Sequence, residues 1–490
     1  MENRIFGIET EFGCFVRDES VGRPERVVEK VKDCVFYRLR RGLIDLHSRD
    51  FAFEPARGGG FLINGGRLYI DAVGDHEEYA TPECSRLSDI VAHEKAGQRI
   101  LLEALQALGW QDKVSFYNNA VDHFGGHTFG CHENYLVSIE DRYFLDSLYN
   151  LLPFLVTRQI FAGTGRVGGH RLNYNDFSNN IMDLSEHEMD YVWVSRFYAV
   201  EIDPTVEFQL SQRADHIVKT ISSRVRFNRA IINPKWDSYY SYNSMHRLHI
   251  LFGEGNMSEC ATALKIGTTS LVLDLLERNL IKPDVRLADP LEALRSVSRD
   301  PTWRWIVRRH DGSTIRAIDL QRIYLETAKQ HLTGRDEDTD WVLREWEYVL
   351  DALELDPMSL DDRLDWVAKR KLLDTFRQQE GLLWHDDIMF SLDMEYHNTD
   401  PSRGLYYGLV EAGLMQRIVT DEDIQNATTN APDNTRAYGR SRAIQHLLAS
   451  RNRAYIVDWD MVYVDKGRQL ELRNPFRTYE KESERFIRSL

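Results

Sequence analysis

Alternation of polar and apolar residues predicts β-strands in the first part of the chain. Residues 4–13 place Glu9 and Glu11 on one side of an extended segment and Ile8, Thr10 and Phe12 on the other. Residues 67–71 alternate in the same way, so Tyr69 and Asp71 share a face. Further strands are expected over 114–119, 132–138, 208–211 and 246–252.

Longer stretches with a period near 3.6 residues predict helices between these strands. They cover residues 25–42, 87–109, 141–161 and 257–280, and Ser258 is suited to cap the last of these helices. Residues 316–382 continue in the helical pattern, whereas residues 164–205 have weak periodicity and are expected to form a long excursion. Antiparallel strands with helices segregated to one side indicate an α+β fold.

A change of composition near residue 417 suggests a domain boundary. Polar and Pro-containing segments follow it, and a short tail with strand patterns ends the chain. We therefore expect a catalytic domain over residues 1–416 and a small C-terminal domain over residues 417–490.

Composition narrows the class of protein. The chain has 490 residues, 42% of them hydrophobic, and a formal net charge of −16, which disfavours nucleic acid and anionic membranes as partners. No apolar run approaches the roughly 20 residues that cross a bilayer. The five cysteines are scattered and include no CxxC pair, which favours a reducing compartment. We expect a soluble, cytoplasmic protein.

Acidic residues on the first two strands are the main candidates for chemistry. Glu9 and Glu11 face one way, a second strand offers Tyr69 and Asp71, and a following loop offers Glu78. Oxygen ligands on stiff strands are suited to Mg²⁺, which also neutralises charge during phosphoryl transfer. The same alternation is also typical of a solvated strand face, and the spacing alone leaves both interpretations open.

Three basic positions could assist with phosphate groups. His132 could bind a metal or donate to a phosphate, and Arg213 and Arg247 could clamp phosphate oxygens; each could equally be an ordinary structural residue. The sequence has no GxxxxGK[ST] loop, so a bound nucleotide would depend on carboxylate-held magnesium and on arginines.

Ten collinear motifs resemble the Pup ligase and depupylase family. The first three read GIETEFG, NGGRLYID and EYATPEC, and the ten motifs occupy residues 7–13, 64–71, 78–84, 117–119, 130–136, 153–159, 210–217, 247–249, 264–268 and 434–437. The resemblance implies a glutamine synthetase-like antiparallel sheet cradle, backed by helices, with a small C-terminal domain.

The resemblance also implies roles for individual residues. Glu9, Tyr69 and Glu78 would coordinate Mg²⁺, with Glu11 and His132 as further candidates. Asp71 matches the family's catalytic aspartate, and Arg213, Arg247 and Arg436 are candidates for ATP contact.

The implied reaction is ATP-dependent ligation of a Pup or Pup-like protein. Its C-terminal glutamate would be phosphorylated and then attacked by a lysine of a protein substrate, giving an isopeptide bond. A depupylase or Pup deamidase, a non-catalytic nucleotide-binding homologue and a small-molecule carboxylate–amine ligase are the alternatives.

Features of the chain point to both branches of the family. Depupylases carry a long inserted loop before the NGxRLY strand, and residues 43–61 are too few to contain it, which favours the ligase. The stretches at 298–301, 320–325 and 404–407 look closer to depupylases, and Tyr117 stands where the family has lysine.

Overall fold

The computed structural model describes most of the chain. The described residues are 1, 4–44, 58–71, 76–123, 127–139, 141–173, 199–222, 229–234, 245–450, 454–464 and 467–490. They divide into two compact units. We name the units by their place in the sequence. The outer unit, which takes most of the two end portions of the chain, contains Glu2–Asn118, Asn398–Pro401 and Ile418–Leu490. The central unit, which takes most of the middle portion, contains Met1, Asn119–His397 and Ser402–Arg417.

An antiparallel sheet organises the outer unit. Its strands follow the order β6-β1-β5-β4-β3-β2. They are β1 (Phe6–Val16), β2 (Gly42–Ile44), β3 (Gly59–Leu62), β4 (Arg67–Ile70), β5 (Glu77–Ala80) and β6 (Val114–Tyr117). The strands expected over 4–13, 67–71 and 114–119 are thereby confirmed.

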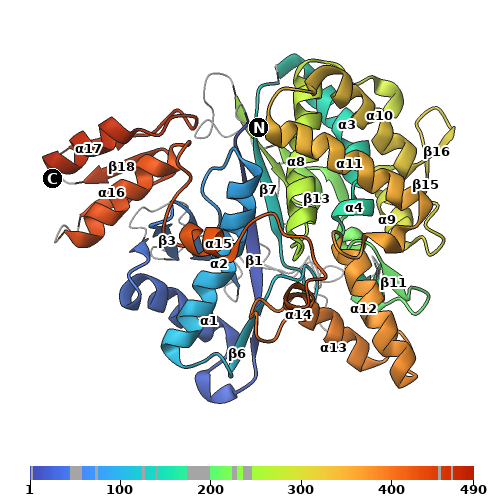
Figure 1. Cartoon of the computed structure of the whole chain (residues 1–490), viewed down its shortest axis with the longest axis horizontal. Coiled ribbons are helices and arrows are strands. Elements are labelled where there is room, and N and C mark those ends of the chain that lie inside the picture. The colour runs from blue at the N-terminus through green and yellow to red at the C-terminus, as the bar shows by residue number, and fades with distance from the viewer. Residues whose placement is uncertain are drawn as a thin grey trace, which may run out of the picture. The chain divides into compact units, whose positions relative to one another are not determined.

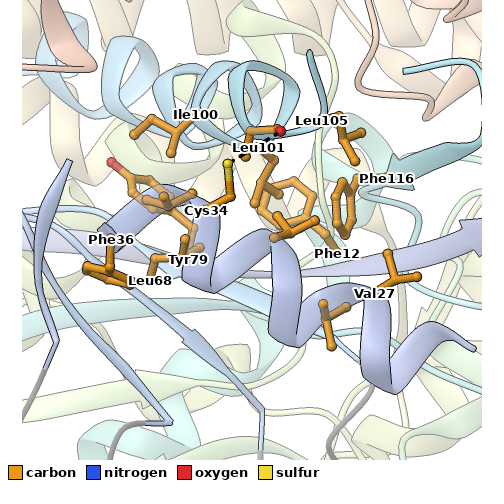
Figure 2. Close-up of a cluster of buried hydrophobic side chains, with 14 of the residues drawn as sticks. Phe12, Val27, Cys34, Phe36, Leu68, Tyr79, Ile100, Leu101, Leu105 and Phe116 are labelled. Atoms are coloured by element: carbon orange, nitrogen blue, oxygen red, sulfur yellow. Dashed lines mark hydrogen bonds between the residues drawn. The ribbon is translucent and has the colours of Figure 1, made fainter. Parts of the chain in front are cut away.

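One face of this sheet is covered by helices. These are α1 (Pro24–Asp33), the π-helical turn η2 (Cys34–Arg38) and α2 (Leu87–Leu108). Figure 2 shows α2 side chains such as Ile100 and Leu105 directed toward Phe12 and Tyr79 of the sheet, in one hydrophobic cluster with Leu68. The residues that alternate with the acids therefore form the core, and the acids take the opposite face.

The first helix is shorter than its pattern suggests. A helix over 25–42 was expected, but the helical segment ends at Arg38 and β2 begins at Gly42. Gly42 packs closely on β3, because a Cβ at this position would lie 2.3 Å from the carbonyl oxygen of Phe61. Strand pairing thus overrides the helical periodicity at this end of the segment. The helix expected over 87–109 is confirmed, and it ends at Gly109 in the left-handed conformation (φ 70°).

The C-terminal segment belongs to the outer unit. It contains α15 (Asp421–Ala427), α16 (Ala437–Ala449), β17 (Tyr455–Val457), β18 (Met461–Val464), β19 (Arg468–Glu471) and α17 (Glu480–Ser489). Ile444 and Leu447 of α16 share a hydrophobic cluster with Leu43 and Phe61 of the β2–β3 hairpin. The division into domains over 1–416 and 417–490 stays a prediction.

The central unit has its own strands. Strand β7 (Cys131–Val137) pairs with β14 (His246–Ile250), β14 with β13 (Ala230–Pro234), and β13 with β12 (Lys219–Ile221). The β12–β13 pair is parallel and the other two are antiparallel. Separate two-stranded sheets are formed by β8 (Arg166–Val167) with β11 (Phe208–Gln209), by β9 (His170–Asn173) with β10 (Ala199–Ile202), and by β15 (Ile306–Arg308) with β16 (Thr314–Arg316).

Helices make up the remainder of the central unit. They are α3 (Asp141–Thr157), α4 (Gln159–Ala162), α8 (Glu259–Glu277), α9 (Pro290–Arg299), α10 (Ala317–Leu332), α11 (Glu337–Leu355), α12 (Asp365–Glu380), α13 (Asp387–Tyr396) and α14 (Leu405–Glu411). Helices α8, α10 and α11 lie side by side (Figure 1). The Ser258 hydroxyl accepts a hydrogen bond from the Ala261 N–H and caps α8, as predicted. The excursion expected over 164–205 contains β8, β9 and β10, and its residues 174–198 lie outside the described residues.

Close packing of α2 on the sheet gives a stability prediction. A Cβ at Gly97 would lie 2.4 Å from Cδ1 of Tyr79, a ring that is 1% exposed. We expect Gly97→Ala to lower the free energy of unfolding by about 1–3 kcal/mol through overpacking, although alanine favours helix. Gly408→Ala in α14 is the control, because a Cβ there meets nothing within 4 Å. Urea unfolding of both variants measures this, and equal stabilisation of the two would contradict the prediction.

Candidate functional site

The carboxylate face of the outer unit is formed by Glu9, Glu11, Tyr69, Asp71 and Glu78. Strand register aligns three of them in one row across three neighbouring strands: Glu11 of β1 lies opposite Glu78 of β5, and Glu78 lies opposite Tyr69 of β4. Directly opposed residues have Cβ atoms about 5 Å apart and point to the same face. The structure therefore brings Glu11, Glu78 and Tyr69 together. The expectation that Glu78 lies in a loop was wrong: it lies within β5, where pairing with β1 and β4 fixes its position.

Glu9 and Asp71 lie one row away from this row, on opposite sides of it. Glu9 precedes Glu11 by two positions and shares its face, opposite Ala80 of β5. Asp71 follows Tyr69 by two positions, immediately beyond the end of β4, and its backbone N–H donates to the carbonyl oxygen of His76. The four acids and the tyrosine that were predicted from β1, β4 and β5 thus belong to one face.

Repulsion among these groups is evident at Glu78. Its side chain is buried, and burial together with the charges of Glu11, Asp71 and Glu9 holds its pKa well above the ordinary value for glutamate. Burial and the charges of Glu78 and Glu9 likewise raise the pKa of the Tyr69 phenol. A bound cation would relieve this repulsion.

The donor atoms of the carboxylate face fit a hard divalent cation. Four carboxylates and a phenol offer only oxygen, which Mg²⁺ prefers over nitrogen or sulfur ligands. Strands held by a packed core also keep such ligands in place. The assignment of Glu9, Tyr69, Glu78 and Glu11 as magnesium ligands stays a prediction that this geometry supports.

A second polar face lies on the β7–β14 pair of the central unit. His132 and Asn134 of β7 share a half-buried face, and His249 of β14 lies opposite Asn134. The rings of His132 and His249 have centroids 5.0 Å apart. Arg247 donates to the Asn134 side-chain oxygen at 3.2 Å, so this face combines two imidazoles with one guanidinium.

Arg213 lies between β11 and β12, in a loop whose backbone and side chains donate to the buried carboxylate of Glu254. Its side chain donates to the Leu251 carbonyl oxygen, and its backbone N–H donates to Glu254. Glu254 also accepts from the Ser211 hydroxyl and from the backbone and hydroxyl of Thr164. Glu254 therefore ties two loops together around Arg213. Nucleotide contact by Arg213 and Arg247, and metal binding by His132, stay predictions.

Arg436 takes part in an ion cluster of the outer unit. Its Nε donates to Glu83 at 2.6 Å and its Nη1 to the Leu472 carbonyl oxygen. Arg440 of α16 donates to both oxygens of Glu83 and to the carbonyl of Gly65. The cluster joins the C-terminal segment to the segment after β5 and to the β3–β4 turn. Nucleotide contact by Arg436 stays a prediction.

Some residues of these faces were not assigned roles from the sequence. Arg67 shares the carboxylate face, with its guanidinium 4.2 Å from the Tyr69 ring centroid, and alternation two residues before Tyr69 could have identified it. His249 lies two residues after Arg247 on the same strand, so alternation could have placed it on the same face as Arg247. Glu254 has no periodic signal, because it lies in a loop.

Known proteins resemble this chain over most of its length. The family model described as Pup-ligase protein matches residues 4–463. A depupylase of Acidothermus cellulolyticus is 38% identical, covering 94% of this chain and 91% of the relative. A Pup–protein ligase of a Nocardioides species is 33% identical and covers 99% of both.

Solved structures agree with these sequence relatives. A complex of the prokaryotic ubiquitin-like protein Pup with its ligase PafA matches with a TM-score of 0.78 at 31% identity, over 99% of this chain and 92% of that chain. The Pup ligase PafA in complex with ADP matches with a TM-score of 0.74 at 32% identity, over 96% and 94%. These likenesses confirm the expected α+β fold. No helix among the described residues has the length and apolarity to cross a membrane.

The Glu83 cluster generates a prediction about acid stability. Burial alone would raise the pKa of Glu83, but Arg440 and Arg436 outweigh it and lower the pKa to about 2. Because the pKa is lower in the folded than in the unfolded protein, the ionised Glu83 stabilises the fold at pH values above its unfolded pKa near 4.5. This contribution is lost as the pH falls toward 2. We expect Glu83→Gln to cost about 3 kcal/mol at pH 7 and to flatten the dependence of stability on pH below 4.5.

Urea unfolding between pH 2.5 and 7 measures both effects. Glu103→Gln is the matched control, because Glu103 also pairs with an arginine, Arg41, but its side chain is 36% exposed. The control should cost about 1 kcal/mol or less. Two results would contradict the proposed contribution of the Glu83 cluster to stability. One is an equal loss of unfolding free energy in the two variants. The other is a stability of Glu83→Gln that falls with pH below 4.5 as steeply as that of the unmodified protein.

Proposed function

Because this chain belongs to the Pup-ligase family, we propose that it is an ATP- and magnesium-dependent ligase that joins a Pup or Pup-like protein to lysines of other proteins. The observation that carries the proposal is the row of Glu11, Glu78 and Tyr69 across three neighbouring strands, with Glu9 and Asp71 on the same face. Such a row fits the metal-held phosphate transfer that carboxylate activation requires.

The proposed chemistry has two steps. The side-chain carboxylate of the C-terminal glutamate of Pup attacks the γ-phosphate of ATP, giving an acyl phosphate and ADP. The amine of a substrate lysine then attacks the acyl carbon and expels inorganic phosphate, leaving an isopeptide bond. Bound Mg²⁺ would supply neutralisation of the phosphate charges.

Residues of the carboxylate face have separate tasks in this scheme. Glu9, Glu11, Tyr69 and Glu78 would hold the cation, each from a strand fixed by the core beneath it. Asp71 would accept a proton from the lysine ammonium, which is otherwise protonated at pH 7. Asp71 lies just beyond β4, and its backbone N–H donates to the His76 carbonyl oxygen. This position, two residues after Tyr69 and near the proposed metal ligands, supports the role of a general base.

Depupylation is the second candidate, and the comparisons give it a specific basis. The depupylase of Acidothermus cellulolyticus is 38% identical, against 33% for the Nocardioides ligase. The extent of the match favours the ligase, because the match to the Nocardioides ligase covers 99% of both proteins, against 94% and 91% for the depupylase. The β2–β3 connection supports the same choice, since Ile44 and Gly59 end and begin paired strands with only residues 45–58 between them.

One assay separates the candidate functions. We expect incubation with ATP, Mg²⁺, a glutamate-ended Pup and a lysine-bearing protein to yield a conjugate of higher mass, detected by gel electrophoresis and mass spectrometry. Omission of ATP and replacement of the terminal glutamate by alanine are the controls. Consumption of preformed conjugate without synthesis would establish the depupylase instead. Nucleotide binding without turnover would indicate a non-catalytic homologue, and turnover on a free amino acid a small-molecule ligase.

The role of Asp71 is tested by Asp71→Asn. We expect the conjugation rate to fall about 10²–10⁴-fold, the usual contribution of a general base, while nucleotide binding and the melting temperature stay close to those of the unmodified protein. Asp112→Asn, at an exposed turn before β6, is the control and should keep its activity. Rates of Asp71→Asn equal to those of the control would remove Asp71 from the mechanism.

A further inference from the structure

Three aromatic rings surround one arginine of the central unit. The guanidinium carbon of Arg370, on α12, lies 5.1 Å from the ring centroid of Phe208 and 5.5 Å from those of Trp303 and Trp384. Phe208 lies on β11, Trp303 between α9 and β15, and Trp384 between α12 and α13. Each distance is within the roughly 6 Å over which an aromatic ring attracts a cation. We call Arg370 and these three rings the Arg370 cage.

One ring of the cage is carried by a strained loop. The backbone of Trp303 has φ 55°, in the left-handed region that bulky residues rarely adopt. The side chain of Asp300 fixes this loop, because it accepts hydrogen bonds from the Thr302 hydroxyl and from the Trp305 N–H, both at 2.6 Å. Strain that the surrounding contacts impose is common at ligand sites. The loop thus adopts an unfavourable conformation in which the Trp303 ring contacts Arg370.

The guanidinium in the cage lacks a polar partner. Among the residues that the structure describes, none forms a hydrogen bond or an ion pair with the side chain of Arg370. Asp374 accepts instead from Arg377 and from Gln378. Burial lowers the pKa of Arg370, against the opposite effect of the charges of Asp374 and Glu207. The positive charge has therefore lost hydration without gaining an anion in contact, which is unfavourable.

A second arginine on the same ring has the partners that Arg370 lacks. The guanidinium carbon of Arg377 lies 5.2 Å from the Trp384 ring centroid. Its Nε and Nη2 donate to one oxygen of Asp374 at 2.9 and 2.8 Å, and its Nη1 donates to the Leu382 carbonyl oxygen. A guanidinium that packs on aromatic rings keeps the donors of its planar edge for an acceptor, and a carboxylate can accept two of them at once.

We propose that the Arg370 cage binds a single carboxylate, the side chain of an aspartate or glutamate in an acidic segment of a protein partner. The charges of Asp374 and Glu207 act on the same guanidinium, so a ligand with one negative charge is favoured over a phosphate group with nearly two. Leu383, the residue before Trp384, is 69% exposed and offers an apolar surface beside the cage. The inference rests on contacts within the central unit and does not depend on the ligase reaction.

A labelled peptide tests the site directly. Fluorescence anisotropy at low ionic strength measures the binding of a fluorescein-labelled, amidated hexaglutamate peptide to the unmodified protein and to Arg370→Met, in which an unbranched apolar side chain replaces the guanidinium. We expect the Kd to rise about ten-fold in Arg370→Met, through loss of a charge-assisted pair. A labelled hexaglutamine peptide reveals any binding of the label itself.

The control removes an equal charge elsewhere in the central unit. Arg344→Met, at an exposed position of α11, should raise the Kd about two-fold or less, because only screened long-range attraction is lost. Equal Kd values in Arg344→Met and Arg370→Met would overturn the proposal. So would a failure of the unmodified protein to bind hexaglutamate more tightly than hexaglutamine.

Two further measurements test the kind of anion. Arg370→Lys keeps the charge and loses the planar fork, so we expect a Kd between those of the unmodified protein and Arg370→Met. A Kd of Arg370→Lys equal to that of the unmodified protein would count against bidentate binding and overturn the proposal. Acetate and inorganic phosphate then compete with the peptide at equal ionic strength, and we expect acetate to displace it at least as well. Stronger displacement by phosphate would overturn the choice of a carboxylate.

Thermal unfolding distinguishes a ligand site from a structural contact. We expect Arg370→Met to lower the melting temperature less than Arg158→Met, because Arg158 is buried and donates to both oxygens of Glu133, which its loss would leave unpaired. A loss in Arg370→Met as large as in Arg158→Met would show that Arg370 holds the fold together, and would overturn the proposal. Failure of Arg370→Met to fold counts as such a loss.

Discussion

The packing of one sheet face on α1 and α2 is the constraint on which the site depends. Phe12, Leu68 and Tyr79 face these helices, and Glu11, Tyr69 and Glu78 must then face the other way. Because side chains alternate along a strand, a slip of one residue would bury the acids and expose the core. The free energy of hydrophobic burial therefore sets the positions of the metal-binding candidates.

This arrangement brings acidic side chains close together, which is electrostatically unfavourable. The acids of the outer unit lie in two kinds of environment. Glu83 is saturated by Arg436 and Arg440, and its pKa is depressed; Glu78 faces other acids, and its pKa is raised. The two residues lie five positions apart, so the contrast arises from their partners and not from local sequence. A carboxylate with full pairing is suited to holding the C-terminal segment, whereas a repelled carboxylate retains its capacity for a cation.

Sequence reasoning succeeded where one periodic signal determined the outcome. Alternation placed Glu9 and Glu11 on one face, and the cap at Ser258 placed the start of α8. It failed where tertiary contacts decide: the helical pattern after Val31 gives way to a π-helical turn and to β2, because Gly42 must approach β3 closely. The register between strands also cannot be predicted from a single sequence. The alignment of Glu11, Glu78 and Tyr69 therefore became known only from the structure. The carboxylate of Glu254 escaped notice for the same reason, since its partners at Thr164 and Ser211 are distant in the chain.

The strands that carry the carboxylate face would serve a ligase and a depupylase alike. Relatives of both names match this chain over 94% and 99% of its length, at 38% and 33% identity. Acyl transfer to a lysine and hydrolysis of the resulting bond share a carbonyl centre and need the same general base, so Asp71 and its neighbours would serve either reaction. In the proposed mechanism, the choice between amine and water would then depend on which nucleophile reaches the carbonyl. The short connection between β2 and β3, two strands from Glu78 in the sheet, is the segment whose length separates the two chemistries in our proposal.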